Sequence, residues 1–188
     1  LMTPDCSNNP RLGNQVNIIG SINVFEAALE VKSKLVVYTS SGGVYGQKDK
    51  INPFPETHYG AYKLAIEGIA RAYYLENKLN SFGLRPFVVY GPGREIGGTA
   101  SISLACKAVA EDKEYKIEFG GKAGFVYVED VANIVLKILD SLPIGAKVIN
   151  INGITEEVVN IVEYLNSFTT NKKITYHNKT LSIVDEIL

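Results

Sequence analysis

Short apolar runs alternate with longer amphipathic segments along the chain, and this alternation restricts the fold more than any other feature of the sequence. Residues 35–38 are apolar throughout, as expected of a strand buried on both faces of a parallel sheet. Apolar residues recur at helical spacing on either side of that run, in segments 14–30 and 58–80. Further strands are expected at 86–90, 115–119, 125–128 and 148–151. Further helices are expected at 100–111, between a cap formed by Glu129 and Asp130 and the end at Leu139, and from Thr155 onward. This order predicts an α/β fold with parallel strands.

The composition excludes several classes of function. Hydrophobic residues make up 46% of the 188 residues and charged residues 21%, as in an ordinary globular domain. A net charge of −1 gives no basic surplus for the phosphates of nucleic acid. No apolar run reaches the roughly 20 residues that span a bilayer and no signal peptide is visible, so a cytoplasmic protein without a membrane partner is expected. Cys6 and Cys106 have no metal-ligand spacing, and no metal is expected.

Tyr59 and Lys63 stand four positions apart at the start of an expected helix. This spacing places both side chains on one face, one turn apart. An ammonium beside a phenol favours the phenolate, so Lys63 is expected to lower the pKa of Tyr59 from its usual value of about 10. Such a tyrosine can exchange a proton with a substrate hydroxyl near neutral pH. Alone, however, the spacing is common on helix surfaces, and its context must carry the interpretation.

The context is a loop of small residues that follows the strand expected at 35–38. It reads Thr39-Ser40-Ser41-Gly42-Gly43-Val44-Tyr45-Gly46, and ligands of open parallel sheets bind at such strand ends. A strand, S-S-x-x-V-Y-G and then Y-x-x-x-K resembles the extended short-chain dehydrogenases/reductases, in particular the nucleotide-sugar epimerases and dehydratases. Segments similar to other motifs of that NAD-dependent epimerase/dehydratase family follow the same order, at 16–28, 83–86, 89–94 and 125–132.

The resemblance implies a Rossmann-like doubly wound parallel sheet, incomplete at the N-terminus, with a small C-terminal substrate-binding region. Residues 1–92 are expected to be the C-terminal part of a catalytic domain, and 93–188 a mixed region with substrate-binding lid elements and late sheet strands. The family's G-x-x-G-x-x-G turn, which holds the cofactor pyrophosphate, has no counterpart. The chain is therefore expected to lack roughly the first third of a usual dinucleotide domain.

The resemblance also assigns roles to individual residues. The catalytic residues implied are Ser41, which bonds the substrate oxygen, Tyr59, the general acid and base, and Lys63, which binds the nicotinamide ribose. The cofactor-binding residues implied are Thr39, Ser40, Tyr59, Lys63, Tyr90, Gly91 and Pro92. The substrate-binding residues implied are Ser41, Gly42, Arg94 and Thr99. Asn17 corresponds to a position that often supports the active site, although a simple polar residue on a helix face is an equally good interpretation.

These roles imply an enzyme that uses NAD or NADP, with NAD preferred, to act on a hydroxyl of a sugar or nucleotide-sugar. Epimerisation and simple oxidation or reduction stay open. Dehydration is less expected, because Gly42 and Gly43 stand where the family's dehydratases carry Asp-Glu. Ala123 stands where the family's sugar-nucleotide members usually carry the arginine that binds the substrate diphosphate, so a nucleotide-sugar substrate is less strongly implied than the family itself. The family resemblance further implies a homodimer through helices 14–30 and 58–80. The alternative is a truncated, cofactor-free member that serves as a binding or dimerisation module.

Overall fold

The computed structural model describes every residue except 171–172, 182, 184 and 187–188. Its largest sheet has parallel strands in the order β1-β2-β6. These strands are β1 (Val36–Thr39), β2 (Ser81–Pro86) and β6 (Ala146–Ile151). Val36 pairs with Ser81, which in turn pairs with Ala146, so the strands start level and their carboxyl ends meet at one edge. Ligands of open parallel sheets bind at that edge.

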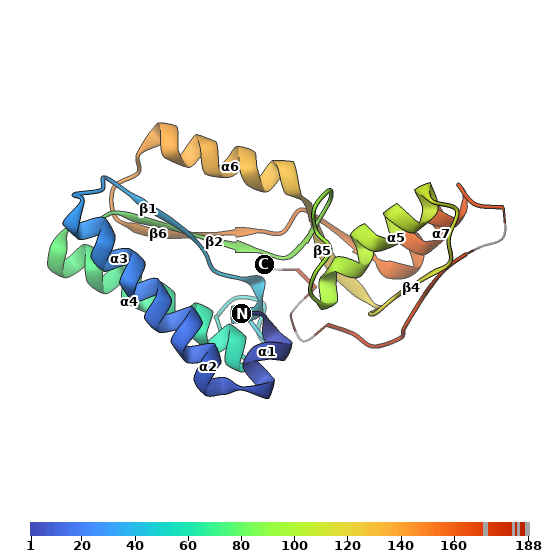
Figure 1. The fold of residues 1–188 in the computed structure, drawn as a ribbon, viewed down its shortest axis with the longest axis horizontal. Coiled ribbons are helices and arrows are strands. Elements are labelled where there is room, and N and C mark those ends of the chain that lie inside the picture. The colour runs from blue at the N-terminus through green and yellow to red at the C-terminus, as the bar shows by residue number, and fades with distance from the viewer. Residues whose placement is uncertain (171–172, 182, 184, 187–188) are drawn as a thin grey trace.

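Helices cover both faces of this sheet (Figure 1). They are α3 (Gly20–Glu30) and α4 (His58–Asn77) on one face and α6 (Val128–Ser141) on the other. Phe25 of α3 and Ala70 of α4 pack with Val36 of β1, while Ile138 of α6 packs with Leu84 of β2. Burial of each large apolar side chain stabilises this arrangement by about 1.5–3 kcal/mol. The prediction of a doubly wound α/β fold is confirmed.

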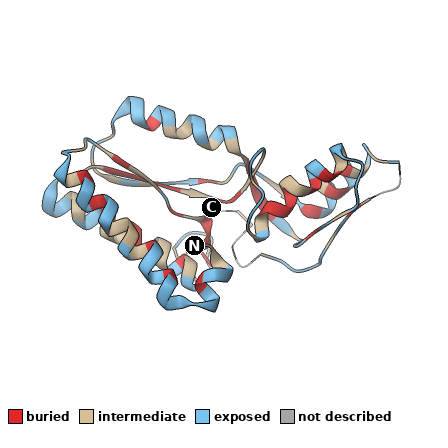
Figure 2. Cartoon of the chain, viewed as in Figure 1, coloured by how far each residue is buried: buried red, intermediate tan, exposed pale blue. Residues whose placement is uncertain are grey.

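A smaller part of the molecule is built on short strands and two helices (Figure 1). Its elements are β3 (Val88–Tyr90), α5 (Ser101–Ala110), β4 (Tyr115–Ile117), β5 (Lys122–Tyr127), β7 (Ile154–Glu157), α7 (Val158–Asn166) and β8 (Ile174–Tyr176). β5 pairs with β3 in parallel and with β7 antiparallel, and β4 pairs with β8 in parallel. Ile117, Val162 and Ile174 share an apolar core, and Figure 2 shows buried residues along α5 and α7.

The N-terminal region adds short helices beside the start of α4. These are α1 (Thr3–Asn8) and α2 (Pro10–Asn14), and a π-helical turn, Gln15–Ile19, leads from α2 into α3. Two 3-10 turns, Gly42–Val44 and Gly98–Ala100, lie in the loops after β1 and β3. Within the described residues, no helix combines the length and the apolar character needed to cross a membrane.

The strand expected at 86–90 is wrong in its bounds, because two strands occupy this region. β2 ends at Pro86, and β3 begins after it. Gly83 was expected near the end of the preceding helix but lies inside β2, where a Cβ would come 2.7 Å from the Tyr38 hydroxyl oxygen. The helix ends earlier, at Asn77, and Lys78 follows it in the left-handed conformation.

Two helix starts also differ from the sequence prediction. The N-cap of α6 is Tyr127, and Glu129 and Asp130 lie in the first turn. There the two carboxylates still complement the positive end of the helix dipole. Thr155 lies in strand β7, and α7 begins only at residue 158.

Candidate active site

The start of α4 carries a row of three polar side chains. Thr57 caps the helix, its hydroxyl oxygen accepting a hydrogen bond from the Gly60 backbone N–H at 3.0 Å. From this fixed start, Tyr59, Lys63 and Glu67 follow at intervals of four residues, so they lie on one helix face. Lys63 donates a hydrogen bond to Thr39 at the end of β1, and Glu67 accepts one from Ser40, so this face is turned toward the loop that begins there.

The loop after β1 forms a tight turn against α4. Ser41 Oγ accepts a hydrogen bond from the Gly43 backbone N–H at 3.0 Å and so starts the turn Gly42–Val44. A Cβ on Gly60 would lie 2.3 Å from the Gly43 carbonyl oxygen, so this close approach requires glycine. The approach brings the Ser41 hydroxyl close enough to Tyr59 to lower the pKa of its phenol.

Opposing effects act on the Tyr59 phenol. Burial is the largest and raises its pKa, whereas the Ser41 hydrogen bond and the positive charge of Arg94 lower it, so that the net pKa is raised. Lys63 is not among the causes of the shift. Its Nζ lies 5.6 Å from the centre of the Tyr59 ring and donates a hydrogen bond to the Thr39 carbonyl oxygen at 2.7 Å. The prediction that Lys63 lowers the pKa of Tyr59 is therefore wrong for this chain.

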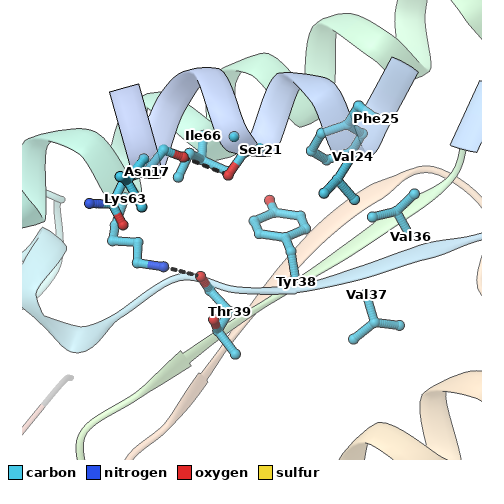
Figure 3. A pocket seen from close by; sticks show the side chains of 12 residues that line it. Asn17, Ser21, Val24, Phe25, Val36, Val37, Tyr38, Thr39, Lys63 and Ile66 are labelled. Atoms are coloured by element: carbon cyan, nitrogen blue, oxygen red, sulfur yellow. Dashed lines mark hydrogen bonds between the residues drawn. The ribbon is translucent and has the colours of Figure 1, made fainter. Parts of the chain in front are cut away.

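Lys63 lies at a groove of about 500 Å³ between α3 and β1 (Figure 3). Tyr38 and Thr39 of β1 line this groove opposite Asn17. An ammonium has three N–H donors, and among the described residues only the Thr39 carbonyl accepts a bond from Lys63. Burial disfavours the charged form of Lys63 and so lowers its pKa. Further hydrogen-bond acceptors would stabilise the ammonium against this effect.

Asn17 is 8% exposed, in the π-helical turn before α3. Its side-chain amide donates to the Gly13 carbonyl oxygen at 3.1 Å and to Cys6 Sγ at 3.4 Å. Its backbone carbonyl accepts a bond from the Ser21 hydroxyl at 2.6 Å (Figure 3). Asn17 thus ties α1 and α2 to α3 beside the groove. π-Helical turns are frequent at functional sites.

A second cavity, of about 510 Å³, gathers the residues that follow β3. Its lining includes Tyr90, Gly91 and Pro92 with Arg94, and Tyr127 from the end of β5. The rings of Tyr90 and Tyr127 are tilted by 53° with centres 5.5 Å apart. The structure therefore brings together the expected cofactor-binding residues of this loop and one expected substrate-binding residue.

Arg94 connects this cavity with Tyr59, whose pKa its positive charge lowers. One guanidinium nitrogen, Nη2, donates a hydrogen bond to Thr99 Oγ1 at 3.2 Å. The Nε atom is buried and has no hydrogen-bond partner among the described residues. A buried donor without a partner carries a free-energy cost.

Two expected site residues have partners inside the protein. Ser40 is 2% exposed, and its hydroxyl donates to Glu67 Oε1 at 2.5 Å. Gly42 is buried against Phe87, with a Cβ position 2.7 Å from Cε2 of that ring. The closest neighbours of the Ser40 side chain and of Gly42 are thus protein groups.

A polar network behind the loop escaped the sequence analysis. Glu67 accepts two bonds from Arg85 of β2, from Nε at 2.8 Å and from Nη2 at 2.5 Å. Arg85 Nη1 also donates to the Tyr45 hydroxyl at 2.5 Å, and that hydroxyl donates to Asn150 Oδ1 at 3.0 Å. One signal was present in the sequence: Glu67 continues the four-residue spacing of Tyr59 and Lys63.

The sequence as a whole matches a known family model. The model of the NAD dependent epimerase/dehydratase family covers residues 3–152. The chain belongs to this family. Within the NAD-dependent epimerase/dehydratase family it is 32% identical over 146 residues to an uncharacterized 37.6 kDa protein of Escherichia coli, which covers 72% of this chain and 42% of that protein. It is 26% identical over 179 residues to GDP-6-deoxy-D-mannose reductase of Pseudomonas aeruginosa, which covers 86% of this chain and 58% of the reductase.

The fold is shared with solved structures. A UDP-glucose 4-epimerase of Thermus thermophilus in complex with NAD matches with a TM-score of 0.82 at 20% identity, over 99% of this chain and 65% of that chain. This likeness confirms the Rossmann-like fold. The chain spans about half the length of the curated relatives it matches, so the activity, substrate and partners of the whole protein are matters for proposal.

Proposed function

We propose that this chain supplies the acid–base group and part of the substrate site of an NAD(P)-dependent epimerase or oxidoreductase that acts on a hydroxyl of a sugar or nucleotide-sugar. The observation that carries the proposal is the position of Tyr59. It is half-buried, it lies where the Ser41 hydroxyl lowers its pKa, and it is one helical turn from Lys63, beside the carboxyl ends of parallel strands. Family membership supports the same conclusion.

In this proposal Tyr59 transfers the proton of the substrate hydroxyl, and Ser41 binds the oxygen that carries it. Ser41 binds the substrate hydroxyl oxygen, and Tyr59 in its phenolate form accepts the hydroxyl proton. The Ser41 hydrogen bond and the charge of Arg94 stabilise that phenolate against burial. When the carbonyl is reduced again, Tyr59 returns the proton to the oxygen. The nicotinamide of a bound NAD(P) would accept the hydride from the carbon and, in an epimerase, give it back on the opposite face.

Lys63 and Thr39 in the groove, with Tyr90, Gly91 and Pro92 beyond β3, are proposed to hold the nicotinamide end of the cofactor, with NAD the preferred form. The fit rests on Lys63, which carries more N–H donors than the described residues engage. Hydroxyl groups of a ribose are suitable acceptors for those donors. The side chain of Ser40 is left out of this set because Glu67 already binds its hydroxyl.

Arg94 and Thr99 are proposed to bind the charged part of a nucleotide-sugar. The place of Arg94 in the lining of the second cavity supports this role, and Arg94 would compensate for the missing arginine at Ala123. We further propose that residues 1–92 carry the catalysis and residues 93–188 carry most of the substrate contacts. Two elements of the second segment also belong to the large sheet, since β6 pairs with β2 and α6 covers one face. No specific observation favours the alternative of a cofactor-free binding or dimerisation module.

The catalytic proposal is tested with Tyr59→Phe in the full-length protein, assayed with NAD and NADP against a panel of UDP-, GDP- and dTDP-sugars. Loss of the phenol should lower kcat by about 100-fold or more, because general acid–base catalysis contributes about 10²–10⁴-fold, and should leave cofactor affinity nearly unchanged. Tyr62→Phe is the matched control, since the Tyr62 hydroxyl donates only to the Pro10 carbonyl oxygen among the described residues. Equal activity of the two variants would remove Tyr59 from its role.

A homodimer through α3 and α4 is proposed as the assembly. The outward face of α4 carries a row of small residues, with Ala61, Ala65 and Ala72 all exposed, and Ile19 beside α3 is 46% exposed. Small side chains allow two helices to approach closely. We also propose a cytoplasmic location, because both cysteines are free and reduced thiols are usual there.

A further inference from the structure

The loop after β1 and helix α4 are joined residue by residue. Three consecutive residues, the last of β1 and the first two of the loop, each meet one of the three side chains in the row on α4. The pairs are Thr39 with Lys63, Ser40 with Glu67, and Ser41 with Tyr59. The outer pairs contain every residue of the proposed catalytic group. The middle pair contains none of them, yet it is the most deeply buried of the three, with Ser40 2% and Glu67 9% exposed.

Glu67 in the middle pair is itself held from the opposite side. Arg85 binds both carboxylate oxygens, with Nε to Oε1 and Nη2 to Oε2, while Ser40 donates to Oε1. Two parallel bonds from a guanidinium fix the plane of a carboxylate as well as its position. Arg85 is fixed in turn by the Tyr45 hydroxyl. The Ser40 hydroxyl thus meets an acceptor whose place and orientation are set by β2.

Stability alone does not explain this arrangement. A buried ion pair stabilises a fold no better than apolar side chains of similar volume, because both charges lose their hydration. The Glu67–Arg85 pair is bidentate and Glu67 accepts a third, directional bond from the loop. Apolar packing has no such directional bonds. The pair and this third bond define one register between the loop and the helix.

We propose that Glu67, held by Arg85, is a positioning residue that acts through Ser40 to keep Ser41 and Thr39 in register with Tyr59 and Lys63. The proposal rests on the proposed function for its catalytic consequence, but its geometric content concerns this chain alone. Breaking the Ser40–Glu67 bond should let the loop shift along α4. Ser41 would then move away from Tyr59 and no longer lower the pKa of its phenol.

The first test follows the Tyr59 phenol in the chain itself and needs no enzymatic activity. 3-Fluorotyrosine is placed at position 59, where its more acidic phenol titrates at accessible pH, and its ¹⁹F resonance is recorded against pH. Ser41 lowers the pKa of this phenol, so Ser40→Ala should raise it, in the same direction as Ser41→Ala. Ser40→Ala leaves the ion pair intact, and Ser40→Thr, which keeps a hydroxyl, should recover most of the shift. The other groups that act on this phenol, Arg94 and Cys6, are unchanged in all three variants.

Glu26→Gln is the matched control for the titration. Glu26 of α3 accepts a hydrogen bond from the Tyr73 hydroxyl of α4, so this variant loosens another contact of the same helix without touching the loop. The pKa at position 59 should stay at the wild-type value in this variant. A pKa that stays unchanged or falls in Ser40→Ala overturns the proposal.

The second test compares kcat with KM in the full-length protein. Displacement of catalytic groups by about 1 Å can cost about 100-fold in rate, so Ser40→Ala and Glu67→Gln should lower kcat by about 10- to 100-fold while KM changes little. Equal kcat in Ser40→Ala and wild type overturns the proposal. If the wild type itself proves inactive on every substrate tried, the proposed function fails while the titration still decides the positioning role.

Discussion

At the scale of single residues, the chemistry depends on how burial and hydrogen bonding balance at one phenol. Burial raises the pKa of Tyr59, and the Ser41 hydrogen bond and Arg94 only partly offset this effect. The phenol is therefore protonated at neutral pH in this chain, and the phenolate becomes populated as the pH rises toward the raised pKa. If Tyr59 is the base, kcat should increase with pH through the neutral and mildly alkaline range.

Gly60 gives a residue-scale prediction about the fit between α4 and the turn. In Gly60→Ala the new methyl group would meet the Gly43 carbonyl oxygen 2.3 Å away. The free energy of unfolding, measured by urea denaturation, should fall by about 1–3 kcal/mol, as in other overpacked sites. Gly20→Ala is the control, because its methyl would come no nearer than 3.9 Å, to the Gln15 carbonyl oxygen. It should leave stability unchanged or raise it by up to about 1 kcal/mol; equal losses at both sites would contradict the close approach.

The sequence was sufficient to predict that Ser41, Tyr59 and Lys63 lie near one another, because a local spacing and a strand-end loop place them on known faces of known elements. It was insufficient for Glu67 and Arg85. These residues are 18 positions apart on a helix and a strand, and only the packing of α4 against β2 brings their charges together. The direction of the Tyr59 pKa shift was missed for a related reason, since burial depends on all the elements around a group.

At the scale of elements, the sequence rules for helix ends and the observed packing disagree most at the end of α4, where glycine can either end a helix or fit a crowded position in a strand. Gly83 resembles a helix-ending residue in the sequence, but it lies within β2 because the Tyr38 side chain occupies the space of its missing Cβ. The real end of α4 is at Lys78, a residue with a Cβ in the left-handed conformation (φ 62°). Sequence rules favour glycine at such a position, so they placed the helix end too late.

Lys78 gives an element-scale prediction about the end of α4. The Lys78→Gly variant removes the Cβ that disfavours this conformation, whereas Lys78→Ala keeps it. The glycine variant should be more stable than the alanine variant by about 1 kcal/mol in urea denaturation. Both variants lose the bond from Lys78 Nζ to the Leu75 carbonyl oxygen, so their difference isolates the backbone effect. An alanine variant as stable as the glycine variant would contradict a left-handed end of this helix.

At the scale of the whole molecule, separate apolar cores support two parts. One core lies within α5, α7 and the short strands, and others lie on the two faces of the large sheet. β3 and β5 contribute to cores of both parts, because Val88 and Phe125 pack in the first core while Val89 and Val126 pack with residues of the large sheet. Tyr90 and Tyr127 end these two strands, and both line the second cavity, so the strands that join the parts also shape the proposed substrate region.

The proposed homodimer gives the prediction at this scale. Ala65→Arg places a long charged side chain in the row of small residues on α4 and should convert a dimer into a monomer of the 20.5 kDa chain, measured by sedimentation velocity. Ala110→Arg makes the same change at the exposed end of α5, outside the proposed interface, and should leave the dimer intact. The same mass for both variants would show that α4 is not the interface.

The residue-by-residue pairing between the loop and α4 has a consequence for insertions and deletions. An α-helix advances by about 100° per residue, so removing one residue between Tyr59 and Glu67 would turn one end of the row away from the loop. Thr39, Ser40 and Ser41 are consecutive residues and cannot follow that rotation. Residues 47–57 carry no such constraint, because they connect the turn to the helix along a largely exposed path. Natural variation in chain length should therefore collect in that connection, while the helix start changes by substitution alone.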